Sequence, residues 1–294
     1  MLIIHKLEKT HFSPSESIII DYILKQGINI KTMTISHIAK ETFTSAPLLI
    51  RIAKKLGYSG WKEFSNAFVS ELEYMYAPSM VDASIPFVVT DDYITISKNI
   101  AQLEIESIQD TLSLLNHDEL YSAIRILRES IEVDLYGVSD YVLIGEEFSY
   151  KMGLIGKRVN ICKYTGDVNV QAYMSHSKHC AILISYSGET EFILRVASIL
   201  KSKNIPIIAI TSIAENDLSK ISNVTLHLSS KEMLHTKIGD FASSQSLKTL
   251  LDILYGCVFS IDYKRNLDDK IELAKLVGDG VSGFQLIDEE IYDK

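Results

Sequence analysis

The sequence is poor in cysteine and contains no long apolar segment. Its three cysteines, Cys162, Cys180 and Cys257, lie far apart and form no C-x-x-C pair, which argues against both a disulfide framework and a zinc ribbon. No apolar run approaches the roughly 18 residues that a membrane-spanning helix requires, so we expect no contact with a membrane. The segment Met1–Lys6 lacks the basic start and apolar core of a signal peptide. We therefore expect a soluble protein of the reducing cytoplasm.

Proline and glycine are also scarce, and the charge is unevenly distributed. With 5 Pro and 14 Gly in 294 residues, the chain has little material for long flexible linkers, and its length predicts two domains. The net charge of −9 argues against a protein that coats nucleic acid along its whole surface. Residues 1–76, however, carry nine basic and seven acidic residues, or +2, which leaves 20 basic and 31 acidic residues, or −11, for the rest. This asymmetry indicates an anionic partner for the first segment.

The first quarter of the chain shows the start and stop signals of several short helices. The expected helices begin after Ser13, after Thr34, after Ser45 and at Trp61. Ser13 and Glu16 match a capping box, and Gly57 ends the third helix, which covers residues 46–56. Short helices joined by a turn of three or four residues are typical of a helix-turn-helix. We therefore assign residues 1–77 to a helix-turn-helix DNA-binding domain.

The remainder of the chain changes its hydrophobic period after residue 130. Residues 78–130 are expected to form a linker and one or two amphipathic connecting helices. Strands are then expected at 131–136, 159–164, 181–184, 206–211 and 224–228, with helices at 141–155, 168–177, 191–202, 215–221 and 241–262. Strands that alternate with helices predict a doubly wound α/β domain with a parallel five-stranded sheet over residues 131–262. Residues 263–294 form a charged tail.

One loop of this domain has the chemistry of an anion site. Ser185–Thr190 reads Ser-Tyr-Ser-Gly-Glu-Thr between an apolar strand and a helix. Such a loop gathers free backbone N–H groups, the positive end of a helix and several hydroxyl donors, a combination that binds phosphate without a lysine. The alternative is an ordinary capping loop, in which Ser187 or Thr190 only satisfies the helix amides.

The same six residues resemble the S-x-S-G-E-T signature of the sugar isomerase (SIS) domain, a fold that binds phosphosugars. The resemblance covers about residues 130–262 and implies that Ser185, Ser187 and Thr190 hold the sugar phosphate. The family's first loop has a G-x-G-x-S pattern, and Gly137–Tyr141 departs from it. Ser139 stands in place of the second glycine and is expected to supply the missing hydroxyl.

The amino-terminal segment resembles the helix-turn-helix of the RpiR family of bacterial sugar-responsive regulators. The resemblance rests on Phe12–Glu16, Thr34–Ala39 and the run Arg51–Phe64, which contains Lys-Leu-Gly-Tyr-Ser-Gly. A recognition helix over residues 45–56 would bring three side chains near base edges (Ser45, Ala46 and Leu48) and four basic side chains near phosphates (Arg51, Lys54, Lys55 and Lys62). A charged, solvated helix face on a protein-interaction module is the alternative.

Two weaker constellations carry less specific chemistry. His176, His179 and Cys180 bring two imidazoles and a thiol together, but a strand begins near the cysteine, so we expect no metal site there. Four residues are conceivable acid–base groups for an isomerase: His235, Glu146, Glu147 and Glu189. Solvated charge is the simpler interpretation of these four, so we expect no catalytic residue.

Together these features predict a transcriptional regulator with two coupled sites. Its expected partners are double-stranded DNA and a phosphorylated sugar, with no cofactor and no metal. We expect a homodimer or homotetramer, because two recognition helices must reach successive major grooves. One alternative is a phosphosugar isomerase with the head as an oligomerisation module. Another, suggested by Asp140 and Tyr141, is a regulator that responds to a protein partner instead of a sugar.

Overall fold

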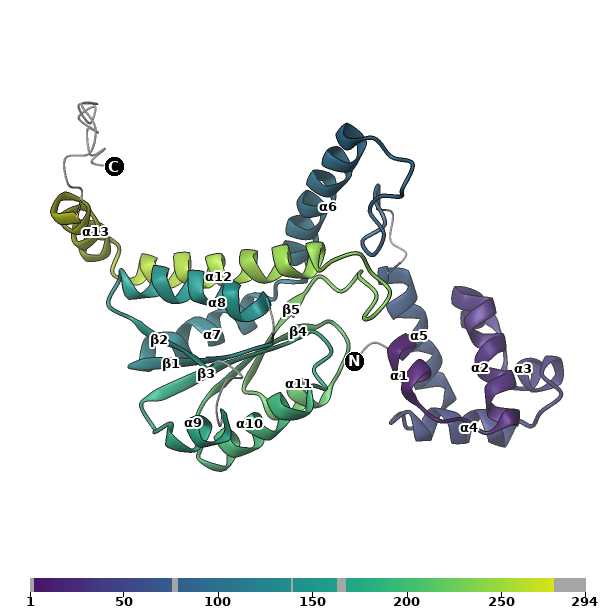
Figure 1. The fold of residues 1–294 in the computed structure, drawn as a ribbon. Helices are drawn as coiled ribbons and strands as arrows, with labels where there is room; N and C mark the ends of the chain where they lie inside the picture. The colour runs from purple at the N-terminus through teal and green to yellow at the C-terminus, as the bar shows by residue number, and fades with distance from the viewer. Residues whose placement is uncertain (1–2, 76–78, 139, 163–167, 278–294) are drawn as a thin grey trace.

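The structure, a computed structural model, describes residues 3–75, 79–138, 140–162 and 168–277. Its first part, residues 3–75, is a helical domain that we call the head (Figure 1). The head contains α1 (Ile3–Lys9), α2 (Pro14–Gln26), the 3-10 helix η1 (Gly27–Thr32), α3 (Ile35–Glu41), α4 (Ala46–Lys55) and α5 (Trp61–Met75). The four helices α2 to α5 confirm the predicted ones, whereas α1 and η1 were not expected from the sequence.

The head folds around a small aromatic and aliphatic core. Its fully buried side chains come from five helices and include Ile19, Ile38, Ile52, Phe64 and Phe68. Phe64 and Phe68 stack with ring centroids 5.9 Å apart. Thr34 caps α3 as predicted, because its Oγ1 accepts the amide of His37 at 3.2 Å.

Two helices connect the head to the second domain. They are α6 (Tyr93–Leu114) and α7 (His117–Glu129), preceded by an irregular segment over residues 79–92. The break between them occurs at Asn116, whose Oδ1 accepts the amides of Asp118 and Glu119 at 2.9 and 3.1 Å. The predicted connecting region is therefore two helices rather than one.

The second domain is the predicted doubly wound α/β fold. Its strands are β1 (Glu132–Tyr136), β2 (Arg158–Cys162), β3 (His179–Ser185), β4 (Ile207–Ser212) and β5 (Val224–Leu228). They form one parallel sheet in the order β2-β1-β3-β4-β5. The helices between and after them are α8 (Asp140–Gly153), α9 (Val168–Met174), α10 (Glu191–Ser202), α11 (Asp217–Ile221), α12 (Phe241–Ile261) and α13 (Tyr263–Val277). The last of these shows that the tail begins as a helix of 15 residues.

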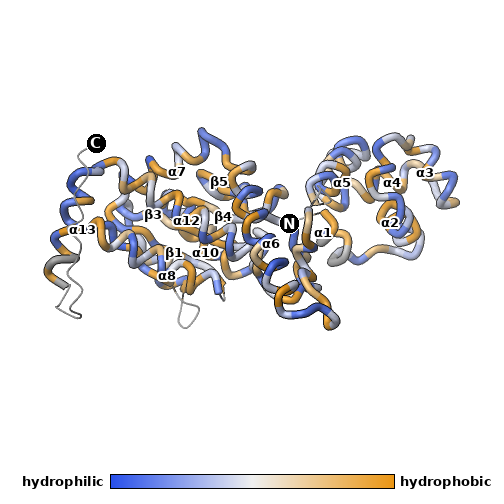
Figure 2. The backbone as a smooth tube through the Cα atoms, turned by 90° about the horizontal axis from the view of Figure 1, so that it is seen from above, coloured by the Kyte–Doolittle hydropathy of each residue, from blue (hydrophilic) through white to orange (hydrophobic). Residues whose placement is uncertain are grey.

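Helices cover both faces of the sheet. Figure 1 shows α7, α8 and α12 on one side and α9, α10 and α11 on the other, while α6 packs on α12 and projects away from the sheet. Each face of the sheet contributes to its own apolar core. The orange strands in the middle of Figure 2 reflect this double burial, which requires apolar residues on both sides of a strand. Within the described residues, no helix is long and apolar enough to cross a membrane.

The direction in which successive strands are added to the sheet reverses between β1 and β3. The helix after β1 (α8) lies on one face, and the helix after β3 (α10) lies on the opposite face. β1 and β3 are direct neighbours, with Tyr136 opposite Leu183. In doubly wound sheets, ligands bind in the crevice at this switch point, outside the carboxyl ends of the strands.

Candidate functional site

The turn between α3 and α4 is fixed by its own side chains. Thr42 Oγ1 donates to the carbonyl oxygen of Ile38 at 2.8 Å and lies 2.8 Å from Thr44 Oγ1. Between these threonines, Phe43 is 98% exposed and has a φ of +53°. A left-handed backbone is costly for a residue with a Cβ. The turn therefore holds an aromatic side chain in solvent at the tip of the head.

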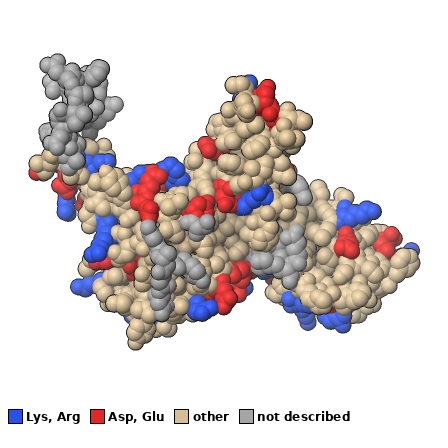
Figure 3. Space-filling model, in the orientation of Figure 1, with Lys and Arg blue, Asp and Glu red and all other residues tan. Residues whose placement is uncertain are grey.

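The predicted recognition helix, α4, turns its basic residues outward. Its buried residues are Leu49, Ile52 and Ala53. Ser45, Arg51 and Lys54 are exposed, and so is Lys62 on α5, whereas Leu48 is half-buried against the head core. Figure 3 shows lysine and arginine side chains along the lower edge of the head, where α4 runs in Figure 1. Four of the predicted DNA-facing residues are thus exposed, whereas Leu48 also packs against the head core.

A buried carboxylate holds α4 against α2. Glu16 is buried, and its Oε2 accepts the Ser13 amide at 2.8 Å and the Lys55 ammonium at 3.3 Å. Arg51 Nε lies 3.5 Å from its Oε1. The bond from the Ser13 amide, assisted by Lys55, lowers the pKa of Glu16 to about 2. Lys55 also donates to the carbonyl oxygen of His11 at 2.6 Å, so this predicted phosphate contact is engaged within the head.

The predicted phosphate loop brings its hydroxyl groups together at the end of β3. Ser185 is the last residue of β3 and is buried, and its Oγ lies 2.8 Å from Thr190 Oγ1. The same Oγ accepts the Gly188 amide at 3.1 Å. Ser187 is half-buried, and its Oγ accepts the Glu189 amide at 3.2 Å. Thr190 precedes α10 but its side chain makes no capping bond, which leaves the positive end of that helix to the loop.

The shape of the loop depends on a close contact between Gly188 and Asn216. Gly188 has a φ of +66°, and a Cβ there would lie 2.0 Å from Asn216 Cγ. Asn216 is fully buried, donates to Thr211 Oγ1 at 3.1 Å and accepts the Ser219 amide at 2.9 Å. The Leu218 amide donates to the carbonyl oxygen of Gly188 at 3.1 Å. The β4–α11 connection therefore supports the phosphate loop from below.

The first loop of the domain faces the same crevice. Gly137 follows β1, and Ser139, predicted to supply a hydroxyl, lies outside the described residues. Asp140 Oδ2 accepts the Ser244 hydroxyl at 2.9 Å. Tyr141 is buried in the core with its Cβ 3.5 Å from the Cβ that a side chain at Gly137 would have. Burial raises the pKa of Tyr141, so its phenol stays neutral.

Three residues of the site were not predicted from the sequence. Tyr186, inside the phosphate loop, donates its hydroxyl to the carbonyl oxygen of Glu232 at 2.6 Å. The Glu232 side chain is fully buried and accepts the Ser243 amide and hydroxyl at 3.0 and 2.7 Å. Lys237 Nζ lies 3.1 Å from Glu232 Oε2 and 5.1 Å from the centre of the Tyr186 ring. Burial opposes its charge, yet Asp240 and Glu232 outweigh burial and raise the pKa of Lys237. A cation therefore lies beside the phosphate loop.

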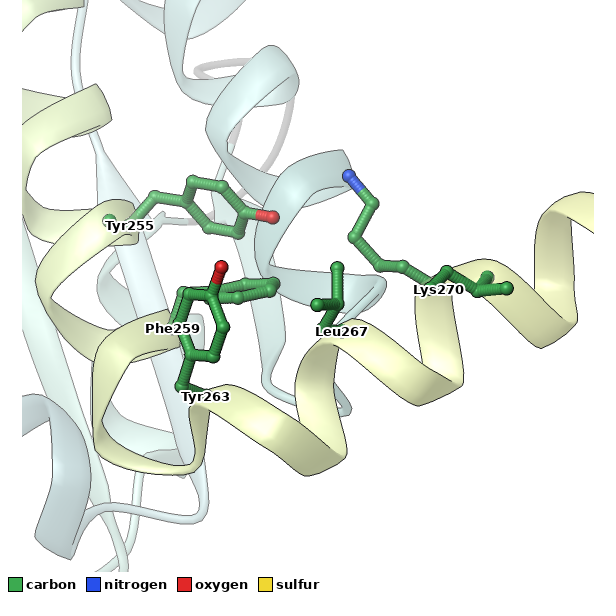
Figure 4. A pocket seen from close by; sticks show the side chains of 7 residues that line it. Tyr255, Phe259, Tyr263, Leu267 and Lys270 are labelled. Carbon is green, nitrogen blue, oxygen red and sulfur yellow. The ribbon is translucent and has the colours of Figure 1, made fainter. Parts of the chain in front are cut away.

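Two hollows lie beside the helices α6, α8, α12 and α13. One, of about 560 Å³, is bordered by α6, α8 and α12, and its lining includes Glu104, Asp140, Asp240 and Lys248. Because these charged lining residues are three carboxylates and one ammonium, this hollow is unfavourable for binding a phosphate. The other, of about 490 Å³, is an apolar groove between α12 and α13 lined by Tyr255, Phe259, Tyr263 and Leu267 (Figure 4). Neither lining includes the three predicted phosphate-binding residues Ser185, Ser187 and Thr190.

Both domains match known families. Residues 1–74 match the helix-turn-helix domain of the rpiR family, and residues 126–248 match the SIS domain. The chain belongs to the RpiR family. It is a DNA-binding regulator of the RpiR type that carries a SIS domain.

Two proteins resemble this RpiR-family chain over both domains, and a third resembles its SIS domain. An HTH-type transcriptional regulator of Caldanaerobacter subterraneus subsp. tengcongensis is 26% identical over 275 residues, or 90% of this chain and 94% of the relative. The structure of Vibrio vulnificus NanR complexed with ManNAc-6P is 25% identical, covers 92% of this chain and 95% of its own, and has a TM-score of 0.61. The sugar isomerase domain of an RpiR transcription factor from Sphaerobacter thermophilus shares the fold at 13% identity, with a TM-score of 0.54 over 61% of this chain and 98% of that one.

The remaining candidates of this RpiR-family chain are engaged elsewhere or exposed. Glu147 pairs with Lys151 and Lys248 on the surface of α8 and α12, and the carboxylate of Glu189 accepts the Asp217 amide at 3.2 Å. His235 is exposed, and Glu146 is half-buried on α8.

The imidazoles of the conceivable metal site are engaged with each other and with a carboxylate. The rings of His176 and His179 are 4.0 Å apart, and His179 Nδ1 lies 2.8 Å from Asp134 Oδ2. In the part of the chain that the structure describes, no group of three or more His, Cys, Asp and Glu residues could hold a metal ion.

Proposed function

We propose that this regulator binds operator DNA through its head and that a phosphorylated sugar, bound at the Ser185–Thr190 loop, changes the affinity for that DNA. The observation that carries the ligand site is the pairing of Ser185 Oγ and Thr190 Oγ1, 2.8 Å apart, at the carboxyl end of β3 and the start of α10. Hydroxyl donors at a helix N-terminus suit a phosphate dianion. NanR, similar over nearly the whole chain, is solved with ManNAc-6P, which supports a sugar phosphate as the effector.

We propose the same domain limits for the protein as the sequence indicates. Residues 1–77 form the DNA-binding domain, 78–130 the linker and connecting helices, 131–262 the phosphosugar-binding domain and 263–294 the tail. We propose a homodimer or homotetramer, because an operator with two half-sites needs two recognition helices about 34 Å apart.

The DNA contacts are proposed from the exposed face of α4. Ser45 and Leu48 face the base edges, and the methyl groups of Leu48 suit a thymine methyl. Arg51, Lys54 and Lys62 contact phosphates. Lys55 shares this surface, but its bonds to Glu16 and His11 give it the separate task of positioning the helix.

The test of the ligand site is calorimetry with ManNAc-6P, and with ManNAc and inorganic phosphate as partial ligands. We expect ManNAc-6P to bind, ManNAc to bind at least tenfold more weakly, and Ser187→Ala to weaken ManNAc-6P by at least tenfold. Ser198→Ala, an exposed serine on α10 whose hydroxyl bonds to the Leu194 carbonyl oxygen, is the matched control. A panel of other hexose and pentose phosphates extends the assay. Equal affinities for Ser187→Ala and parent across the panel would overturn the site.

Isomerase activity is the second function to test, because the SIS fold also occurs in chains described as sugar-phosphate isomerases. We propose that this chain binds without converting. Its acid–base candidates support this, since Glu147 is paired with two lysines and His235 is exposed. Incubation of the phosphosugar panel with the protein, followed by chromatography, should recover each sugar unchanged, and an aldose–ketose product would reverse this assignment.

A further inference from the structure

One side chain of the head is bound within the α/β domain. Tyr74 lies in the last turn of α5, and its hydroxyl donates to Asp110 Oδ2 on α6 at 2.6 Å. The same oxygen accepts the amide of Ser230 at 3.0 Å. Burial, together with the Asp110 carboxylate, raises the pKa of Tyr74, so the phenol keeps the proton that it donates. Lys231 Nζ lies 6.0 Å from the centre of the Tyr74 ring. The end of the head is thus fixed by two hydrogen bonds across the domain boundary.

Ser230 belongs to the segment that joins β5 to α12, residues 229–240, which we call the β5–α12 segment. Figure 1 shows this yellow-green segment reaching toward the upper end of α5. Two residues beyond Ser230, the carbonyl oxygen of Glu232 accepts the hydroxyl of Tyr186 from the phosphate loop at 2.6 Å. A single short piece of backbone therefore contacts the proposed effector loop and the head.

The β5–α12 segment is held by hydrogen bonds to the start of α12 and to the linker. The buried carboxylate of Glu232 accepts the amide of Ser243 at 3.0 Å and the ammonium of Lys237 at 3.1 Å, which joins the segment to the start of α12. The segment also donates two amides to the linker, from Met233 to Ser84 Oγ at 2.8 Å and from Ile238 to the Ser84 carbonyl oxygen at 2.9 Å. Only one residue, Lys231, separates the backbone group bonded to Tyr186 from the backbone group bonded to Tyr74.

We propose that Tyr74 is the positioning residue through which the occupied phosphate loop sets the orientation of the head. This inference rests on the proposed function, because it requires an effector at Ser185–Thr190. A phosphate that binds the loop hydroxyls and amides shifts Tyr186. Because the Tyr186 hydroxyl is bonded to the Glu232 carbonyl oxygen, the backbone at Glu232 shifts as well. The Ser230 amide then changes its bond to Tyr74. The two states are Tyr74 bonded and Tyr74 released. An effector that favours one of them shifts the head between two orientations and so shifts operator affinity.

The first test is the coupling ratio of Tyr74→Phe, defined as the operator Kd without ManNAc-6P divided by the Kd at saturating ManNAc-6P. Allosteric coupling is typically about 5- to 150-fold in affinity. We expect a parent ratio in that range, in either direction, and a Tyr74→Phe ratio within twofold of 1, with the calorimetric Kd for ManNAc-6P unchanged within twofold. Tyr93→Phe, which removes a hydroxyl from a residue that is 88% exposed on α6, should keep the parent ratio. A parent-like ratio in Tyr74→Phe would overturn the proposal.

A ligand-free measurement separates this inference from the proposed function. If no phosphosugar binds the parent, the proposed function fails, and the route can still be tested by amide hydrogen exchange of the apo protein. We expect Tyr74→Phe to speed exchange at the Ser230 amide and also in the phosphate loop, because removing the hydroxyl frees the β5–α12 segment. Unchanged exchange in the loop, with faster exchange confined to Ser230, would show that the route ends at the segment and would refute the inference.

A double variant tests whether the two tyrosines act in one route. Tyr186→Phe removes the bond to the Glu232 carbonyl oxygen, and its own ManNAc-6P affinity is measured alongside. Residues of one network give non-additive effects. The coupling ratio of the double variant should therefore match that of Tyr74→Phe alone. A parent-like ratio in Tyr186→Phe alone would show that coupling bypasses this tyrosine and would contradict the proposal. Emission of the single tryptophan, Trp61 at the start of α5, reports in each case that the head is folded.

Discussion

Gly188 offers the sharpest test of how the phosphate loop is built. Replacing it with alanine introduces two separate costs. The residue has a φ of +66°, a backbone conformation that L side chains rarely adopt, and its new Cβ would lie 2.0 Å from both Cγ and Oδ1 of Asn216. Because Asn216 is fully buried and bonded to Thr211, Ala214 and Ser219, it cannot move aside without breaking those bonds.

The expected magnitude follows from the two costs. Left-handed strain for a residue with a Cβ is worth about 1 kcal/mol. Displacing Asn216 removes the cap of α11 and leaves buried polar groups unpaired, which together cost about 2–4 kcal/mol. Gly188→Ala should therefore destabilise the α/β domain by about 3–5 kcal/mol, and at about 2–4 °C per kcal/mol its melting temperature should fall by roughly 6–20 °C.

Two other glycines separate these costs experimentally. Gly57 has a φ of +95°, and a Cβ at this position would meet no atom within 4 Å, so Gly57→Ala measures strain alone. Gly256 lies within α12 with equally open space, and alanine there should stabilise the helix by up to about 1 kcal/mol. Scanning calorimetry and circular dichroism of the three variants provide the comparison, with Trp61 emission following the head. If Gly188→Ala costs no more than Gly57→Ala, the contact with Asn216 does not shape the loop.

Three further predictions concern the head. Glu16→Gln should lower the stability of the head by about 2 kcal/mol at pH 7. Because the folded pKa of Glu16, about 2, is below the ordinary 4.5, the stability advantage of the parent is complete above pH 4.5 and declines as the pH falls toward 2. Urea titrations followed by Trp61 emission at pH 7, 5 and 3.5 measure this difference, and a difference that does not change with pH would contradict the prediction. Phe43→Gly should raise the urea midpoint of the head, because it relieves about 1 kcal/mol of left-handed strain; a lower midpoint would show that the exposed ring stabilises the turn. Lys54→Ala should reduce the salt dependence of operator binding, measured by gel-shift titration, by about one unit of log–log slope. Lys55→Ala should mainly lower the urea midpoint of the head. A reduced salt dependence in Lys55→Ala with an unchanged urea midpoint would refute the role given to Glu16.

Local patterns in the sequence were sufficient for the parallel sheet and for most of the helices. Thr34 and Ser45 occupy the N-cap positions of α3 and α4, and the strand predicted over residues 181–184 is β3, His179–Ser185. Hydrophobic period and caps act between residues a few positions apart, so the sequence displays them directly. α1 and η1, of 7 and 6 residues, carry no such signal.

The long-range contacts that hold the candidate sites in place could not be predicted from local patterns. The partners of Glu16 in α4 are about 40 positions away, and the bonds of Tyr186 and Tyr74 to the β5–α12 segment span 46 and 156 positions. Such contacts depend on how helices and loops pack, for which the local pattern contains no information. Lys55 illustrates the consequence, since its position on α4 predicts a phosphate contact while the buried carboxylate opposite it engages its charge.

The bonds of Tyr74 also limit how freely the two domains can be recombined. Its hydroxyl needs an acceptor on α6, 36 positions away, and a donor amide 156 positions away. A chimera that joins this head to the α/β domain of another regulator keeps the helix-turn-helix core but loses both partners unless the new domain has a carboxylate at the place of Asp110 and a backbone amide at the place of Ser230. Compatible heads and sensors can therefore be recognised by comparing these positions before any chimera is built.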